Sequence, residues 1–186
     1  MGFNKNRDAN IIQNNQKSSQ KTHKKEKLII KLDITFMKYV FEIKDSVFEK
    51  GIIFDKTGNF LFRMKGNRSS IDFSYNDIYR LQGKIFMHNH PRGGGFSLPD
   101  IKTACALNMA GMIVVTKKYI HIFFPPQERE TFLISDYRGI LKCYQIRQNI
   151  IPLSKRFLPD DEIWRIVACD LGFRYLKIKI RINKNL

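Results

Sequence analysis

Short apolar runs that alternate with amphipathic segments are the feature of this sequence that most restricts its fold. The runs are rich in β-branched and aromatic residues and are bounded by turn residues, which is typical of strands; they lie at 47–54, 60–64, 84–88, 112–116 and 119–124. Helical patterns lie between and after them, at 74–81, 97–110, 127–147 and 160–171. Strands interleaved with helices predict an α/β (α+β) domain, and short connections predict a mixed β-sheet flanked by helices.

The two ends of the chain complete this outline. At the C-terminal end, apolar residues alternate with basic ones, which predicts a strand with one basic face; the apolar residues are Leu176, Ile178, Ile180 and Ile182, and the basic residues are Lys177, Lys179 and Arg181. Residues 28–32 and a stretch within 36–43 are apolar and are interpreted as strands or a short helix. Residues 1–27 are rich in Asn, Gln, Lys and Ser and predict a disordered basic arm. We expect a core at 28–125, with 126–186 packed on the same domain.

The positive charge of the chain is concentrated at its ends. The 186 residues include 33 Lys and Arg against 17 Asp and Glu, a formal net charge of +16. Residues 1–31 hold 8 basic and 2 acidic residues, 32–137 hold 14 and 11, and 138–186 hold 11 and 4. The ends therefore predict docking to nucleic acid or to an acidic partner, while the middle of the chain is nearly balanced.

Cysteine usage and hydropathy indicate the compartment. Cys105, Cys143 and Cys169 are widely spaced and include no C-x-x-C pair, which favours a reducing, cytoplasmic setting. No apolar stretch approaches the ~20 residues that span a bilayer, and no apolar signal segment is present. We therefore expect a cytoplasmic protein without a membrane partner.

Residues 88–100 carry the clearest chemical signal. His88 and His90 stand two positions apart at the end of a predicted strand, so both imidazoles lie on one face, with Cα atoms roughly 6.5 Å apart. Two such rings can bind one ion at the ~2.0–2.1 Å that zinc prefers, and Asp100 can supply a third, oxygen ligand. The glycines at 93–95 allow the chain to fold back toward the histidines. Three protein ligands and one open position are typical of catalytic zinc sites.

Each part of this signal is weak alone. Ser97-Leu98-Pro99-Asp100 is also a helix capping box, and the chain holds a second one, Ser74-Tyr75-Asn76-Asp77, with no histidine beside it. Only the combination of H-x-H-P, a Gly-rich loop and S-x-x-D is specific.

This combination resembles the JAMM motif of the JAB/MPN metalloprotease superfamily. The segment His88-Asn89-His90-Pro91 is most similar to RadC-like and other bacterial and phage JAB proteins, and the resemblance covers roughly residues 45–125. Six residues, 91–96, separate His90 from Ser97, one fewer than the common family spacing. The chain therefore departs from the family pattern at the position of Ser97.

The resemblance implies a JAB/MPN (cytidine deaminase-like) architecture and a zinc metallohydrolase that cleaves a peptide or isopeptide bond of a protein through a zinc-activated water. It makes His88, His90 and Asp100 the metal ligands, and Ser97 the residue that stabilises the oxyanion. The family's catalytic Glu lies on an early strand. Glu49, at the start of the apolar run 49–54, is the first candidate, and Glu42 is the alternative.

A second hypothesis is a RadC-like or phage-associated module that binds nucleic acid or joins an assembly, with little or no catalysis. The basic ends of the chain favour this hypothesis, and so does the similarity of the His88-Asn89-His90-Pro91 segment to RadC-like proteins. Two further residues near the motif receive structural interpretations. Cys105 is expected to be a buried core residue, and His121 an ordinary strand residue rather than a fourth ligand.

Overall fold

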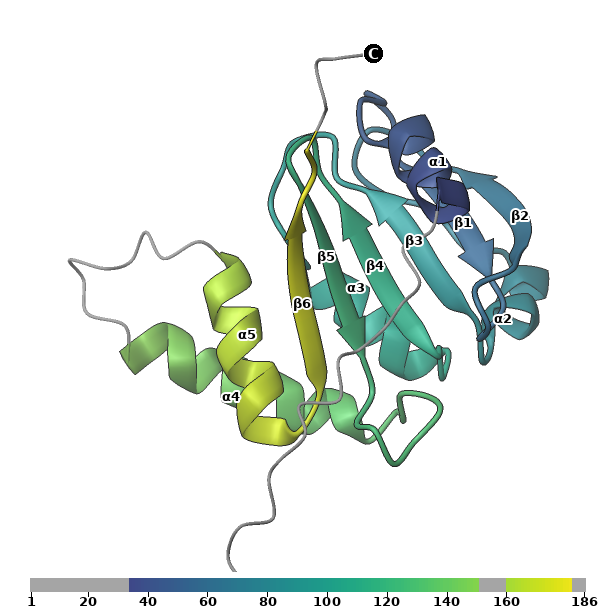
Figure 1. The fold of residues 1–186 in the computed structure, drawn as a ribbon. Helices are drawn as coiled ribbons and strands as arrows, with labels where there is room; N and C mark the ends of the chain where they lie inside the picture. Colours follow the sequence, from purple (N-terminus) through teal and green to yellow (C-terminus); the bar gives the residue numbers. More distant parts are fainter. Residues whose placement is uncertain (1–33, 151–159, 182–186) are drawn as a thin grey trace, which may run out of the picture. The chain divides into compact units, whose positions relative to one another are not determined.

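In the computed structural model of the protein, the described residues are 34–150 and 160–181 (Figure 1). All of them belong to one structural unit, residues 31–186. The predicted arm at 1–27, the predicted strand or helix at 28–32, and Ile182 lie outside the described residues. Within this part of the chain, no helix has the length and apolar character needed to cross a membrane.

A mixed sheet of six strands forms the framework, in the spatial order β2-β1-β3-β4-β5-β6. The strands are β1 (Lys50–Phe54), β2 (Phe60–Lys65), β3 (Ile85–Asn89), β4 (Gly111–Val115), β5 (Tyr119–Phe124) and β6 (Arg174–Lys179). β3 and β4 pair in parallel, and every other neighbouring pair is antiparallel. The parallel pair is connected through a helix, as parallel neighbours require.

Helices cover both faces of the sheet (Figure 1). They are α1 (Ile34–Ile43), α2 (Tyr75–Leu81), α3 (Leu98–Ala106), α4 (Asp136–Ile150) and α5 (Asp160–Leu171). On one face, Tyr39 of α1 packs edge-on against Phe54 of β1, with ring centroids 5.3 Å apart. On the other face, the main core joins β-strand residues such as Phe86 and Val114 to residues of α3, α4 and α5. The prediction of a mixed sheet flanked by helices is confirmed.

Several predicted boundaries are wrong. The helix predicted at 127–147 begins at Asp136, because Phe132 is buried in the core and its main-chain N–H bonds to Met109 O at 2.9 Å instead of continuing a helical turn. The helix predicted at 97–110 ends at Ala106, because Asn108 adopts a left-handed conformation with φ of 48°. The strand predicted to include Glu49 begins at Lys50.

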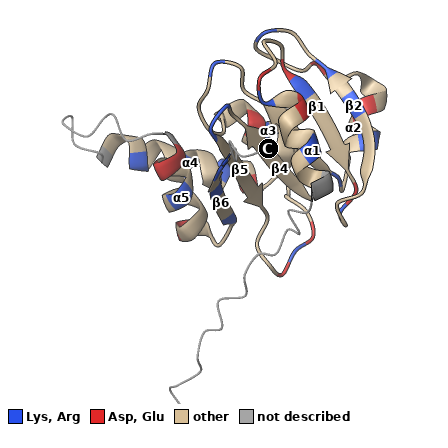
Figure 2. Cartoon of the chain, turned by 45° about the horizontal axis from the view of Figure 1, so that its top comes forward, with Lys and Arg blue, Asp and Glu red and all other residues tan. Residues whose placement is uncertain are grey.

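The C-terminal strand, β6, carries exposed basic side chains at Lys177 and Lys179, as the alternation predicted, but the charge of Lys177 is paired. Lys177 forms an ion pair with Asp161 of α5 and lies over the Tyr119 ring, 4.1 Å from its centroid. Basic and acidic residues are interspersed over α4 and α5 (Figure 2), and Arg147 of α4 forms an ion pair with Asp170 of α5. Opposite charges on the two helices and β6 therefore compensate part of the positive charge at this end.

Candidate metal centre

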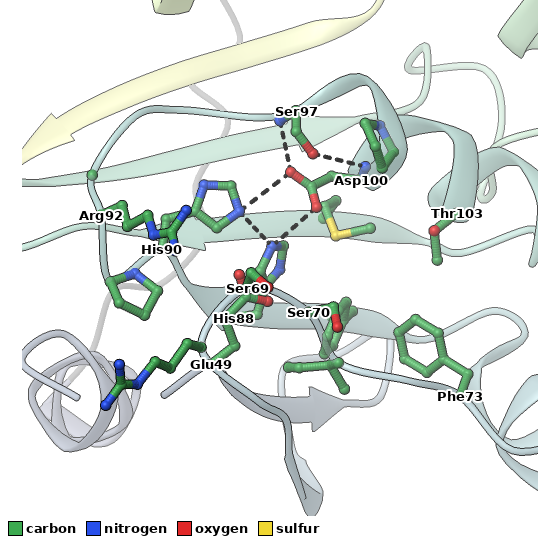
Figure 3. Close-up of a pocket in the computed structure, with 17 residues that line it drawn as sticks. Glu49, Ser69, Ser70, Phe73, His88, His90, Arg92, Ser97, Asp100 and Thr103 are labelled. Carbon is green, nitrogen blue, oxygen red and sulfur yellow. Dashed lines mark hydrogen bonds and ion pairs between the residues drawn. The ribbon is translucent and has the colours of Figure 1, made fainter. Parts of the chain in front are cut away.

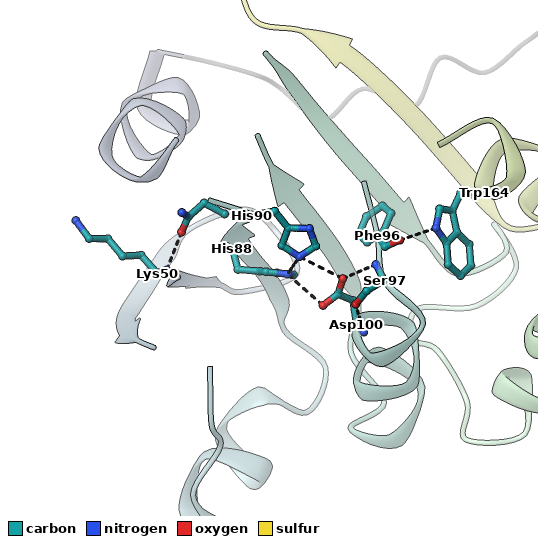
Figure 4. Close-up of polar contacts among 8 residues, drawn as sticks. Lys50, His88, His90, Phe96, Ser97, Asp100 and Trp164 are labelled. Carbon is teal, nitrogen blue, oxygen red and sulfur yellow. Dashed lines mark hydrogen bonds and ion pairs between the residues drawn. The ribbon is translucent and has the colours of Figure 1, made fainter. Parts of the chain in front are cut away.

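The end of β3 brings the two histidines together. His88 is 3% exposed and its ring stacks on Phe86, with centroids 4.9 Å apart. His90 follows the strand, and its main-chain N–H still bonds to Val115 O of β4 at 2.9 Å, which extends the sheet register past the last strand residue. The two Nε2 atoms consequently lie 3.0 Å apart on one face (Figure 4).

Asp100 reaches the histidines through the helix cap of α3. Gly93 and Gly94 take positive φ values of 84° and 88°, which only glycine adopts without strain, and so turn the loop back toward the sheet. Ser97 is the N-cap residue: its Oγ accepts from the Asp100 main-chain N–H at 3.2 Å, and its own N–H donates to Asp100 Oδ2 at 2.7 Å. The cap therefore fixes the Asp100 carboxylate, and the shortened loop still delivers it to the site.

The three side chains converge on one point (Figure 3). Asp100 Oδ1 lies 3.3 Å from His88 Nε2, and Asp100 Oδ2 lies 3.4 Å from His90 Nε2. Ligand atoms bound at about 2.0–2.1 Å in a tetrahedral arrangement stand about 3.3 Å apart, so these separations suit a single ion. Among the described residues, this is the one group of three His, Cys, Asp or Glu side chains placed to hold a metal ion.

The ligands influence one another's protonation. Burial raises the pKa of Asp100, but the two adjacent histidines outweigh it and hold the pKa well below the usual range of a carboxyl group. Burial lowers the pKa of His90, but hydrogen bonding and the charge of Asp100 outweigh it and raise the pKa above its usual value. The carboxylate is thus charged at neutral pH and attracts a cation, either a proton on His90 or a metal ion.

The structure separates the two candidate glutamates. Glu49 lines the same pocket as both histidines, and burial raises the pKa of its carboxyl group, although His88 and His90 oppose the shift. Glu42 lies on α1, where its carboxylate accepts two hydrogen bonds from Arg63 at 2.7 and 2.9 Å, and it does not line the pocket. Only Glu49 is placed beside the metal ligands.

The segment that carries Glu49 is fixed to its neighbours on two sides. Its main-chain N–H donates to Asn67 O at 2.7 Å, and its carbonyl accepts from Gly66 at 2.9 Å. Asn89, the middle residue of the H-x-H segment, is fully buried, and its side-chain oxygen accepts from the Lys50 N–H at 2.7 Å. β3 therefore positions the histidines with one face and the glutamate segment with the other.

A pocket of about 440 Å³ surrounds the site. Sequence reasoning missed the part of the pocket wall that the segment between β2 and α2 provides. Ser69 and Ser70 belong to it (Figure 3), and Arg68 lines the same pocket. Sequence reasoning also missed Arg92, which directly follows Pro91, the last residue of the H-x-H-P segment. No motif marks these residues, because a loop side chain becomes part of a pocket only through tertiary folding.

The C-terminal helices hold the metal-site loop from behind. The Trp164 indole N–H of α5 donates to the Phe96 carbonyl at 2.7 Å, directly before Ser97 (Figure 4). His121 hydrogen-bonds through Nδ1 to Tyr175 Oη at 2.9 Å and is not part of the ligand group. Cys105 is fully buried, and burial raises its thiol pKa to about 12, so both structural interpretations agree with the fold.

All five predicted site residues line one pocket: Glu49, His88, His90, Ser97 and Asp100. Three of them form a group that could hold a metal ion, and the other two lie in the same pocket. Comparisons with known proteins give no match, because no family model, curated protein or solved structure is sufficiently similar to the chain.

Proposed function

We propose that the protein is a zinc-dependent hydrolase of the JAB type, which cleaves a peptide or isopeptide bond in a protein substrate. The observation that carries this proposal is the convergence of His88, His90 and Asp100 on one point, with Glu49 in the same pocket. Two imidazoles and one carboxylate, with an open side toward a pocket, are the donor set of catalytic zinc sites. The His-Asn-His-Pro segment and its resemblance to JAB proteins support the same class.

Glu49 is the proposed general base. A zinc ion held by the three ligands would polarise the substrate carbonyl and lower the pKa of a water molecule toward ~7. The Glu49 carboxylate accepts the proton of the attacking water and returns it to the amine that leaves. A carboxyl pKa that burial raises suits this role, since one group must both accept and donate the proton near neutral pH.

Ser97 is the proposed oxyanion donor. Its Oγ accepts from the Asp100 N–H, so its hydroxyl hydrogen remains available to donate toward the pocket. A donor directed at the negative charge that develops on the carbonyl oxygen contributes about 3 kcal/mol in other hydrolases. The same residue thus orients a metal ligand and faces the reacting bond.

Peptide cleavage tests this proposal, because the chain offers a matched pair of glutamates. The zinc-loaded protein is incubated with a proteome-derived peptide mixture and with peptides linked through a lysine side chain, and new termini are identified by mass spectrometry. Glu49→Gln should retain zinc and generate no new termini, whereas Glu42→Gln, outside the pocket, should cleave as the wild type does. Cleavage by Glu49→Gln at the wild-type rate would contradict the assigned role, and no cleavage by the wild type would contradict the function.

The nucleic-acid or assembly-binding alternative remains a prediction from charge. It depends partly on Lys177, Lys179 and Arg181, and the first of these is paired with Asp161. A nucleic-acid-binding module would show a DNA affinity that falls steeply with salt. Each neutralised phosphate adds about −0.9 to the slope of the logarithm of the binding constant against the logarithm of the salt concentration. The described residues offer no feature that favours it over hydrolysis.

A further inference from the structure

The pocket contains two arginines that the proposed mechanism does not use. The described residues include ten arginines. Five of these form ion pairs with acidic side chains, namely Arg63, Arg80, Arg129, Arg147 and Arg165, and Arg174 donates to Pro125 O. The side chains of the other four form no ion pair or hydrogen bond with another described residue: Arg68, Arg92, Arg138 and Arg181. Two of these four, Arg68 and Arg92, line the pocket of the metal centre.

The two arginines come from different parts of the fold. Arg92 belongs to the loop that follows His90, whereas Arg68 belongs to the segment between β2 and α2. Figure 3 shows Arg92 beside His90, and shows Ser69 and Ser70, which follow Arg68, across the pocket from Asp100. Both arginines are exposed, so each can reach a molecule that enters the pocket.

The charge of the pocket favours an anionic ligand. Glu49 and Asp100 are its two carboxylates, and Asp100 already faces both histidines. The charges of the two arginines balance those of the two carboxylates, so a divalent ion in the site would make the net charge of the pocket positive. The planar guanidinium of Arg binds a carboxylate through two parallel hydrogen bonds, which gives orientation as well as affinity.

We propose that Arg68 and Arg92 select protein substrates that carry Asp or Glu side chains next to the scissile amide bond. This inference rests on the proposed hydrolase function and names its substrate class. An acidic polypeptide fits better than nucleic acid, because a phosphate backbone needs a row of cations. The pocket offers two arginines, the Glu49 carboxylate and an apolar wall that includes Phe73 and Phe86.

A binding measurement tests the inference without turnover. Two fluorescein-labelled peptides, one of alternating Ala and Glu and one of alternating Ala and Gln, are titrated into full-length Glu49→Gln protein with zinc added, at 0.15 M salt. The Glu peptide should bind about tenfold more tightly or better, as two charge-assisted contacts predict. The preference should fall to near unity when Arg68→Gln and Arg92→Gln are combined. Arg138→Gln, on an exposed and unpaired arginine of α4 outside the pocket, should retain it, which separates the pocket from the general positive charge.

Equal binding of the two peptides, binding of neither, or an unchanged preference in the double variant would overturn the inference. A DNA duplex that loses affinity in the double variant, when the Glu peptide does not, would also overturn it and assign the arginines to nucleic acid. Because no bond is cleaved in this assay, a preference that depends on the two arginines would support the inference even if the peptide mixture were left intact. An intact mixture would count against the hydrolase function alone.

Discussion

The side chain of Asn89 holds the main chain on both sides of Glu49. Its oxygen accepts from the Lys50 N–H at 2.7 Å, and its amide donates to the Phe48 carbonyl at 3.2 Å. The same side-chain amide of Asn89 donates a third hydrogen bond, also of 3.2 Å, to the Ser46 carbonyl. The residue between the two histidines therefore connects the metal ligands to the proposed base, so that one short segment of β3 sets the distance between them.

Asn89→Ala should reduce turnover far more than zinc content. Loss of three hydrogen bonds leaves the Glu49 segment free to shift, and a displacement near 1 Å can cost about 100-fold in rate. The unfolding free energy should fall by about 2–4 kcal/mol, because the fully buried Asn89 side chain and its partly buried main-chain partners lose three hydrogen bonds. Zinc content and peptide cleavage, measured on the same preparation, check this expectation.

Asn59→Ala is the control for that variant. Asn59 donates through its amide to Asp55 and Thr57 in the turn between β1 and β2, which does not line the pocket. It should lose stability without losing turnover. Equal cleavage by Asn89→Ala and the wild type would show that Glu49 needs no such support.

The two capping boxes of the chain separate the structural role of Ser97 from its chemical role. Ser74 and Ser97 each accept from the residue three positions ahead at the start of a helix, so each substitution by Ala should cost about 1 kcal/mol of stability. Only Ser97→Ala should also lower the cleavage rate, by about 100-fold, because only Ser97 lines the pocket of the candidate metal centre. Similar cleavage rates for Ser74→Ala and Ser97→Ala would contradict the proposal that Ser97 stabilises the oxyanion.

Trp164→Phe should weaken zinc binding from outside the pocket. The substitution preserves an aromatic ring against Tyr144 but removes the hydrogen bond to Phe96 O that holds the metal-site loop. Loss of a group that supports metal ligands costs about tenfold or more in metal affinity. Competition with a zinc chelator measures the change. Tyr75→Phe, which removes an exposed hydrogen bond to Tyr79 on α2, should bind zinc as the wild type does.

The sequence predicted those parts of the site that lie within short stretches of the chain. The spacing of His88 and His90 on a strand, and of Ser97 and Asp100 on a helix cap, fixes each pair locally. The meeting of the two pairs depends on the loop between them, where Gly93 and Gly94 supply the reversal that a shorter connection needs. The mixed sheet flanked by helices also followed from local patterns and short connections, whereas the order of its strands was not predicted.

The parts that sequence reasoning missed depend on distant contacts. Helix α4 begins at Asp136 rather than at residue 127, because Phe132 packs in the core and its main-chain N–H bonds to the Met109 carbonyl. Helical periodicity in the sequence does not reveal this contact. Lys177 is exposed but its charge is paired, because Asp161 of α5 lies within ion-pair distance of β6. In both cases, a tertiary contact decides what the local pattern does not reveal.

His121 should make the stability of the zinc-free protein fall at acidic pH. Burial, with a smaller contribution from Lys177, lowers its pKa to about 4, whereas Asp161 opposes the shift. In the unfolded chain the imidazole of His121 binds a proton near pH 6.5, whereas in the folded chain it does so only near pH 4. The contribution of His121 to the unfolding free energy is therefore complete above pH 6.5 and is lost as the pH falls from 6.5 to 4. Relative to His121→Phe, the wild type should lose up to about 3 kcal/mol across this window. Urea unfolding at pH 7 and pH 4 measures it, and parallel losses in the two proteins would contradict this origin.

Zinc stoichiometry tests the central claim most directly. The full-length protein is saturated with zinc, freed of excess by gel filtration, and analysed by mass spectrometry of the metal. The wild type should hold about one zinc per chain, and so should His121→Ala, because His121 lies outside the ligand group. His88→Ala and Asp100→Asn should hold almost none. A wild type without stoichiometric zinc, or a His88→Ala variant that holds as much as the wild type, would contradict the assignment of this site.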